Sequence, residues 1–225
     1  HNYALRHDQG IIPVSSIMLQ AASLTCVKGD HVLFDHLDLS IHPGQIYQIS
    51  GANGTGKTCL LKILAGLSPP EEGAVFWNGE PIQRHPDKFR SLLAYLGHSI
   101  GLKLDLTPTE NLEFWSSLYG ASQTPLADAL IRVGLKDQAH IACRYLSDWQ
   151  RRRAAIARFQ INDALVWILD EPLTALDSSG IKSVCQTIDA HLDRGGLVVI
   201  TSHQPITLDR HPVEEFRIQD TACPA

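Results

Sequence analysis

A glycine-rich segment that ends in a lysine and a threonine occupies residues 51–58. It reads Gly51, Ala52, Asn53, Gly54, Thr55, Gly56, Lys57 and Thr58, and it matches the phosphate-loop pattern G-x-x-x-x-G-K-[ST] at every fixed position. In such a loop the backbone N–H groups curl around a β-phosphate, the lysine reaches the β- and γ-phosphates, and the threonine hydroxyl is a ligand for Mg²⁺. The structural alternative is a glycine-rich turn before a helix. Because the lysine and the threonine follow in place, the pattern predicts a site for a nucleoside triphosphate with Mg²⁺.

Two acidic residues, Asp170 and Glu171, directly follow the apolar run 164–169. Beside a phosphate loop, an aspartate at a strand end is suited to hold the shell of Mg²⁺, usually through water, and the following glutamate can polarise the water that attacks a γ-phosphate. His203 stands two residues after a second apolar run, 197–201, and is a candidate sensor of the γ-phosphate. A solvated strand end and a surface histidine are the structural alternatives.

Short apolar runs precede these polar residues and predict the strands that position them. Residues 45–50, 164–169 and 197–201 have the length and the β-branched or aromatic content of buried strands. A helix between the last two runs is predicted by apolar residues at helical spacing, namely Ile181, Val184, Ile188 and Leu192. Strand, helix and strand in this order are typical of an α/β sheet, which presents its chemistry at the strand ends.

The rest of the chain divides into segments of different character. Residues 18–97 combine short alternating segments with the phosphate loop, and they predict an antiparallel β flap and the first part of a nucleotide-binding core. Residues 98–150 are expected to form an inserted helical subdomain, and residues 151–225 the second part of the core and a C-terminal tail. We expect residues 1–17 to be a tag or a poorly ordered extension.

Composition limits the classes of protein and partner. The 225 residues carry a formal net charge of −5, so the chain offers no basic footprint and we expect no nucleic-acid partner. The arginine run 151–153 is interpreted as the polar face of a helix. Five scattered cysteines without a C-x-x-C pair indicate reduced thiols of a cytoplasmic protein. Because no apolar stretch approaches the roughly 20 residues of a membrane-spanning helix, contact with a membrane is expected through a partner.

The order of the motifs resembles the nucleotide-binding subunits of ABC transporters. The phosphate loop is followed by the helical insert, Leu146–Gln150, the acidic strand end, Leu176-Asp177 and Thr201–His203. Within this family the chain is most similar to the ATP-binding subunits that serve haem export in cytochrome c maturation, over nearly all of residues 18–205. The resemblance implies a P-loop NTPase fold of the ABC ATPase type, α/β, with a mostly parallel sheet core, an antiparallel β flap and an inserted helical subdomain.

The same resemblance implies partners and a location. It implies a homodimer that holds two ATP molecules between its subunits, with each phosphate loop facing residues 146–150 of the other subunit. It further implies docking on an integral membrane subunit, at the cytoplasmic face of the inner membrane, so that this chain would meet the haem pathway only indirectly.

Carried over position by position, the family pattern assigns a role to each candidate residue. Residues 51–58 would bind the phosphates of ATP, and Thr58 and Asp170 would hold Mg²⁺. Glu171 and His203 would be catalytic, acting on the attacking water and the γ-phosphate. The remaining residues expected at the nucleotide are Ser147, Gln150, Asp177 and His98, of which Asp177 would form a dimer contact.

Three positions depart from the family pattern. His98 stands where many relatives have a glutamine, and it would couple to the transporter rather than bind Mg²⁺. Val27 stands where an aromatic residue normally stacks on adenine. In the signature segment, residues 146–150, the usual L-S-x-G-Q is changed by Asp148 and Trp149. Tryptophan poorly tolerates a positive φ or a close backbone approach, and an aspartate adds negative charge beside a phosphate.

Three functions stay open at this point. The first is an ATP-hydrolysing subunit that energises a haem-handling or export step in cytochrome c biogenesis. The second is a regulatory ABC module with weak hydrolysis, caused by the altered signature segment. The third is an ABC ATPase of another kind, serving another transporter, DNA repair or ribosomes, and the acidic balance of the chain disfavours the nucleic-acid versions.

Overall fold

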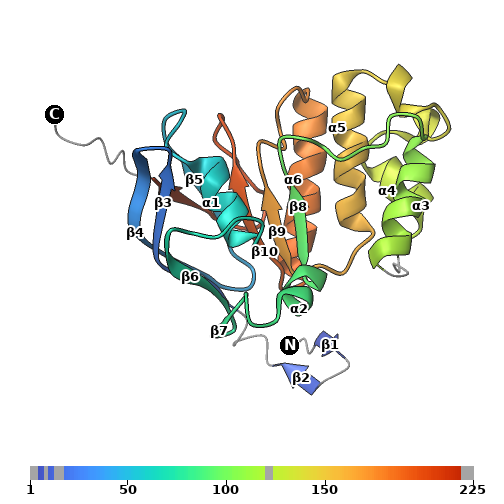
Figure 1. Cartoon of the computed structure of the whole chain (residues 1–225). Coiled ribbons are helices and arrows are strands. Elements are labelled where there is room, and N and C mark those ends of the chain that lie inside the picture. The colour runs from blue at the N-terminus through green and yellow to red at the C-terminus, as the bar shows by residue number, and fades with distance from the viewer. Residues whose placement is uncertain (1–4, 8–9, 13–17, 120–123, 219–225) are drawn as a thin grey trace.

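Five parallel strands form the central sheet of the computed structural model, which describes residues 5–7, 10–12, 18–119 and 124–218 (Figure 1). Neighbouring strands are parallel, in the order β11, β5, β10, β9 and β8. Their bounds are Val213–Arg217, Ile46–Ser50, Leu197–Thr201, Val166–Leu169 and Leu93–Leu96. The predicted strands near residues 45–50, 164–169 and 197–201 are therefore confirmed as β5, β9 and β10, which lie side by side at the centre of the sheet.

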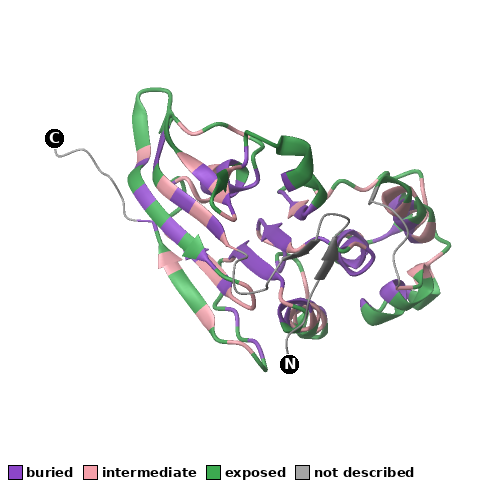
Figure 2. Ribbon diagram, turned by 90° about the horizontal axis from the view of Figure 1, so that it is seen from below, coloured by how far each residue is buried: buried purple, intermediate pink, exposed green. Residues whose placement is uncertain are grey.

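Helices cover both faces of this sheet, which explains why β9 and all but the last residue of β10 are apolar. On one face, α1 (Lys57–Leu64) packs against β9 and β10 and also against β3 of the second sheet. On the other face lie α5 (Asp148–Ala157) and α6 (Ser178–Asp193), whose apolar residues share a core with Trp167 and Val198. The predicted helix that follows residues 178–179 is confirmed as α6. Figure 2 shows the buried residues concentrated along the central strands and the helices beside them.

The predicted antiparallel flap is a sheet of four strands in the order β4, β3, β6 and β7. Their bounds are His31–Ile41, Leu19–Lys28, Glu72–Trp77 and Glu80–Pro81. Asn78 and Gly79 connect the last two strands with φ of 53° and 80°, as a tight hairpin turn requires. A short helix, α2 (Pro86–Ser91), then leads into β8. The flap packs across α1, so that the helix after the phosphate loop lies between the two sheets (Figure 1).

The helical part contains α3 (Pro108–Tyr119), α4 (Leu126–Arg132) and the start of α5. The predicted capping box opens α3: the backbone N–H of Thr107 donates to Glu110 at 2.8 Å, and the N–H of Glu110 donates to Thr107 Oγ1 at 3.2 Å. The boundary expected between residues 150 and 151 falls inside α5. Ala154 and Ala157 of that helix pack with the buried residues of α3 and α4, so the helical part extends past residue 150.

Residues 5–12 contain a feature that the sequence did not indicate. Two three-residue strands, β1 (Leu5–His7) and β2 (Gly10–Ile12), pair antiparallel. The rest of the expected extension, residues 1–4, 8–9 and 13–17, lies outside the described residues. Among the described residues no helix is both long and apolar enough to cross a membrane. Four cysteines are free thiols, and Cys223 lies outside the described part.

Candidate functional site

The phosphate loop connects the end of β5 to the start of α1. Gly51 and Gly56 have φ of 148° and 93°. A Cβ on Gly51 would lie 2.8 Å from Thr55 Oγ1, and one on Gly56 would lie 3.0 Å from Leu33 Cβ, so both positions require glycine. The ammonium group of Lys57 donates to the carbonyl oxygens of Gly51 and Ala52, at 2.7 and 2.9 Å. The loop therefore gathers its lysine and its backbone at the N-terminal end of α1, where the helix dipole favours an anion.

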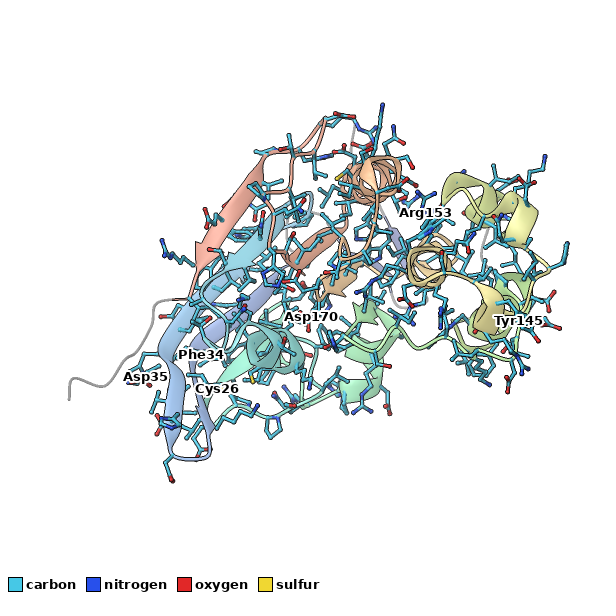
Figure 3. All side chains as sticks on the ribbon, turned by 90° about the horizontal axis from the view of Figure 1, so that it is seen from above. Cys26, Phe34, Asp35, Tyr145, Arg153 and Asp170 are labelled. Atoms are coloured by element: carbon cyan, nitrogen blue, oxygen red, sulfur yellow. The ribbon has the colours of Figure 1, made fainter. Side chains whose placement is uncertain are left out.

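Asp170 connects this loop to the neighbouring strands. It follows β9, is 4% exposed, and its carboxylate accepts two hydrogen bonds. Thr58 Oγ1 donates to Oδ2 at 2.9 Å, and Thr201 Oγ1 donates to Oδ1 at 2.7 Å. The Asp170 carboxylate thus joins the end of β9 to the end of β10 and to the first turn of α1. Figure 3 shows Asp170 beside α1, in the middle of the molecule.

Glu171 has a backbone conformation that is rare for a residue with a side chain, with φ of 50°. Its backbone N–H donates to Thr201 Oγ1 at 2.9 Å. Its carboxylate Oε1 lies 3.6 Å from Nε2 of His203, and the two side chains are 18% and 65% exposed. The structure therefore brings together Glu171 and His203, as the sequence predicted, and it adds Thr201 as the residue that holds both acids.

A buried cation that sequence reasoning missed lies near these acids. Burial lowers the pKa of the Arg152 guanidinium, while the charges of Glu171 and Asp170 act in the opposite direction. Arg152, Arg153 and Arg158 are each at most 9% exposed. The interpretation of the arginine run as a polar helix face is therefore wrong for Arg152 and Arg153. Both lie on the side of α5 that faces the core, where Arg153 pairs with Asp177 and donates to the Val133 carbonyl, and the charges of Glu171 and Asp170 act on Arg152.

The signature segment forms the first turn of α5. Ser147 is the N-cap: its Oγ accepts from the backbone N–H of Gln150 at 3.4 Å, while Gln150 Oε1 accepts from the N–H of Ser147 at 2.9 Å. Asp148 lies 3.3 Å from Arg151, and Trp149 lies in helical backbone rather than at a positive φ. The conformational part of the expected conflict at Trp149 is therefore absent, because the segment needs no left-handed backbone at this position.

Asp177 has a structural role that is visible within one chain. It caps α6 by accepting from the backbone N–H of Gly180 at 2.9 Å, and it pairs with Arg153 at 2.5 Å. Hydrogen bonds from Gly180, Ser179 and Arg153 hold the pKa of its carboxyl below the usual range. Among the described residues, Ser147, Gln150 and Asp177 form no hydrogen bond to the phosphate loop or to Asp170. They belong to a second group of candidate residues, at the N-terminal ends of α5 and α6.

The two remaining departures, His98 and Val27, are both exposed. His98 follows β8 by two residues, and the pairing of Leu96 with Leu169 places it at the same sheet edge as Glu171. Val27 is 39% exposed on β3, opposite Val32 of β4. At that position the flap presents aliphatic surface.

A phosphate loop on a parallel sheet, an acidic strand end that it contacts, and a capped signature helix in a helical subdomain together define an ATPase subunit of the ABC transporter class. A family model described as "ABC transporter" matches residues 34–174. The chain belongs to this family and is an ABC-type ATPase that binds ATP, which confirms the resemblance and the predicted fold class.

Relatives with curated names are similar to this chain over most of its length. The cytochrome c biogenesis ATP-binding export protein CcmA of Vibrio vulnificus (strain CMCP6) is 40% identical over 90% of this chain and 100% of its own length. The protein of the same name from Methylococcus capsulatus is 44% identical over 86% of this chain and 94% of its own length.

Solved structures agree with the fold. The structure of an ATP-binding subunit of an ABC transporter matches 89% of this chain and 85% of its own, with a TM-score of 0.79 at 22% identity. A putative ABC transporter ATP-binding protein from Pyrococcus furiosus matches 89% of this chain and 97% of its own, with a TM-score of 0.76 at 26% identity.

Proposed function

We propose that this chain is the ATP-hydrolysing subunit of a membrane ABC complex that energises a haem-handling or export step in cytochrome c biogenesis. The names of its relatives support the pathway. The observation that carries the hydrolytic role is the 2.9 Å hydrogen bond between Thr58 and Asp170, because it joins the phosphate loop to the acidic strand end. Glu171, the next residue in the chain, would then face the γ-phosphate of a bound nucleotide.

Mg²⁺ fits the residues at this point. The Thr58 hydroxyl and the Asp170 carboxylate are adjacent oxygen donors, the ligand type that Mg²⁺ prefers, and they leave positions for phosphate oxygens and water. Bound there, Mg²⁺ would neutralise charge on the β- and γ-phosphates. Within the described residues no group of three or more His, Cys, Asp or Glu side chains could hold a metal ion, which suits a metal held mainly by its nucleotide.

The other residues then take distinct parts in hydrolysis. Residues 51–56 hold the β-phosphate through backbone N–H groups, and Lys57 balances the charge of the β- and γ-phosphates. Glu171 accepts the proton of the attacking water, for which its partly exposed carboxylate is open on the side of His203. His203 orients that carboxylate and contacts the γ-phosphate.

The expected partners complete a nucleotide site that a single chain does not assemble by itself. Ser147, Gln150 and Asp177 are held apart from the phosphate loop, so they would reach a nucleotide only across the interface of a homodimer. An integral membrane subunit would carry the transported substrate, and this chain would dock on it peripherally, at the cytoplasmic face. His98, exposed beside the site, would sense that docking.

Steady-state ATP hydrolysis by the full chain with Mg²⁺, compared with Glu171→Gln, tests the proposal. We expect Glu171→Gln to lower kcat at least about 100-fold, the usual contribution of a general base, and to leave ATP binding intact. Glu215→Gln, on an exposed position of β11, is the matched control and should keep its turnover. Equal turnover in the parent chain and Glu171→Gln would refute the role of Glu171. Tight ATP binding without turnover in any of them would favour the regulatory alternative.

A further inference from the structure

The signature segment departs from its family pattern at Trp149, and the position of that side chain is fixed by one contact. The indole ring lies against the guanidinium of Arg153, four residues later on α5, at 4.8 Å from the ring centre. Trp149 as a whole residue is 38% exposed. Because the Arg153 guanidinium is bonded to Asp177 and Ser179 at the start of α6, the contact holds the ring at the side of α5 that faces α6. Of the N–H groups in the first turn, that of Gln150 is capped by the Ser147 hydroxyl.

Arg153 is itself held on three sides. Its Nη2 donates to Asp177 Oδ1 at 2.5 Å and to Ser179 Oγ at 2.9 Å, and its Nη1 donates to the carbonyl oxygen of Val133 at 3.3 Å. The side chain is 10% exposed. A guanidinium with these three acceptors, on α6 and at the end of α4, has little freedom. It is therefore a fixed support for the ring, unlike a solvated arginine.

Asp148 is the other unusual residue of the signature segment, and its negative charge has a partner on the same helix. The Asp148 carboxylate is 88% exposed and lies 3.3 Å from Arg151, so a cation on the same helix faces it. Ser147 keeps its capping geometry with Gln150. The polar groups that a signature segment would offer to a phosphate are thus retained, although the glycine is missing.

We propose that Arg153 is a positioning residue for the signature segment, which holds the Trp149 ring away from the N-terminal end of α5 so that a second subunit's nucleotide can approach. This inference rests on the proposed function, since the nucleotide is the one shared by the homodimer. It implies that the altered signature segment belongs to an active ATPase. It also implies that Trp149 permits formation of the dimer only when Arg153 is present.

A double-mutant cycle tests whether the effect of Arg153 on dimer formation depends on Trp149. ATP-driven dimer formation is measured by light scattering in the Glu171→Gln background, where turnover does not consume the nucleotide. We expect Arg153→Met to weaken dimer formation about tenfold, in line with a partly desolvated cation–π contact, when Trp149 is present. In the Trp149→Gly background the same change should have a much smaller effect. An equal loss in both backgrounds would overturn the proposal, because it would show that Arg153 acts only through Asp177 and the helix cap.

Arg144→Met is the matched control. Arg144 also lies over an exposed aromatic ring near the segment, that of Tyr145 at 5.8 Å, and it pairs with Asp105. We expect it to leave ATP-driven dimer formation unchanged. A dimer that forms only after Trp149→Gly would also overturn the proposal, since the ring would then block the approach despite Arg153.

A spectroscopic measurement separates this inference from the proposed function. The indole N–H resonance of Trp149, assigned through Trp149→Phe, should shift in Arg153→Met and stay in place in Arg144→Met, with no nucleotide required. If no variant forms a dimer with ATP, the proposed function fails, and the indole resonance alone then decides whether Arg153 holds the ring. An unchanged resonance in Arg153→Met would overturn the positioning role.

Discussion

Thr201 is the residue whose removal should disturb the site most selectively. Its buried hydroxyl, 1% exposed, donates to Asp170 Oδ1 at 2.7 Å and accepts from the backbone N–H of Glu171 at 2.9 Å. Thr201→Val keeps the shape of the side chain and removes both bonds. A hydrogen bond to a charged group contributes about 1.5–3 kcal/mol, and a buried donor left without a partner costs about 1–3 kcal/mol. We expect a loss of about 3 kcal/mol in the free energy of unfolding.

The same change should affect catalysis more than binding. Glu171 has a φ of 50°, and the bond to Thr201 is the one that its backbone N–H makes. Without that bond the carboxylate loses its fixed direction, so kcat should fall while the affinity for ATP, which depends on the phosphate loop, changes little. Urea unfolding followed by circular dichroism and steady-state hydrolysis measure the two effects.

Two further variants make this reasoning refutable. Thr201→Ser retains the hydroxyl and should recover most of the stability and the turnover. Thr187→Val removes a hydroxyl that donates to the Ser183 carbonyl on its own helix at 2.9 Å and accepts from Gln160 Nε2 at 3.5 Å, and should cost about 1 kcal/mol. If Thr201→Val is no more costly than Thr187→Val, or if Thr201→Ser is as damaging as Thr201→Val, the argument is wrong.

Three other predictions concern stability. A Cβ on Gly196 would lie 2.1 Å from Nε2 of the buried His191, so Gly196→Ala should lower the free energy of unfolding by about 3 kcal/mol, and a normal denaturation midpoint would contradict the packing. Burial lowers the pKa of His191 to about 3 from 6.5, so the unfolded chain binds a proton that the folded chain does not. Stability should therefore decrease as the pH falls from 6.5 to 3, by up to about 1.4 kcal/mol per unit, and His191→Leu should remove this slope in pH-dependent urea titrations. The pKa of Asp177 is lowered, chiefly by the Gly180 N–H, so its stabilising charge is complete above its ordinary value and lost in acid. The difference in Tm between the parent and Asp177→Asn should shrink as the pH falls below about 4, and a constant difference would show that the charge is not involved.

The sequence predicted the parts of the site that depend on spacing along the chain. The phosphate loop has a fixed order of glycine, lysine and threonine, and the strand before it is apolar and short. Asp170 and Glu171 likewise follow a continuous apolar run, which is typical of a strand covered on both faces. Because parallel strands end at one sheet edge, these local patterns were enough to place the loop, the two acids and His203 together.

The residues that the sequence did not reveal act through contacts between distant segments. Thr201 appears in the chain as the last residue of a strand, and its two hydrogen bonds arise only when β9 lies beside β10. Arg152 and Arg153 look like part of a solvated basic run, yet their burial depends on which side of α5 faces the core. The stack of Arg153 on Trp149 likewise needs Asp177 of α6 to hold the guanidinium. No pattern within one segment predicts such arrangements.

The outer strand of the flap, β4, affects how the chain behaves at high concentration. An eleven-residue strand at the end of a sheet is a template to which another chain could add a strand. Here, however, the pairing with β3 shifts register three times, and His36 takes a φ of 47° within the strand. Asp35 and Asp38 also place charge along it. These irregularities interrupt the backbone ladder, so association between copies is directed away from this edge and aggregation through it is disfavoured.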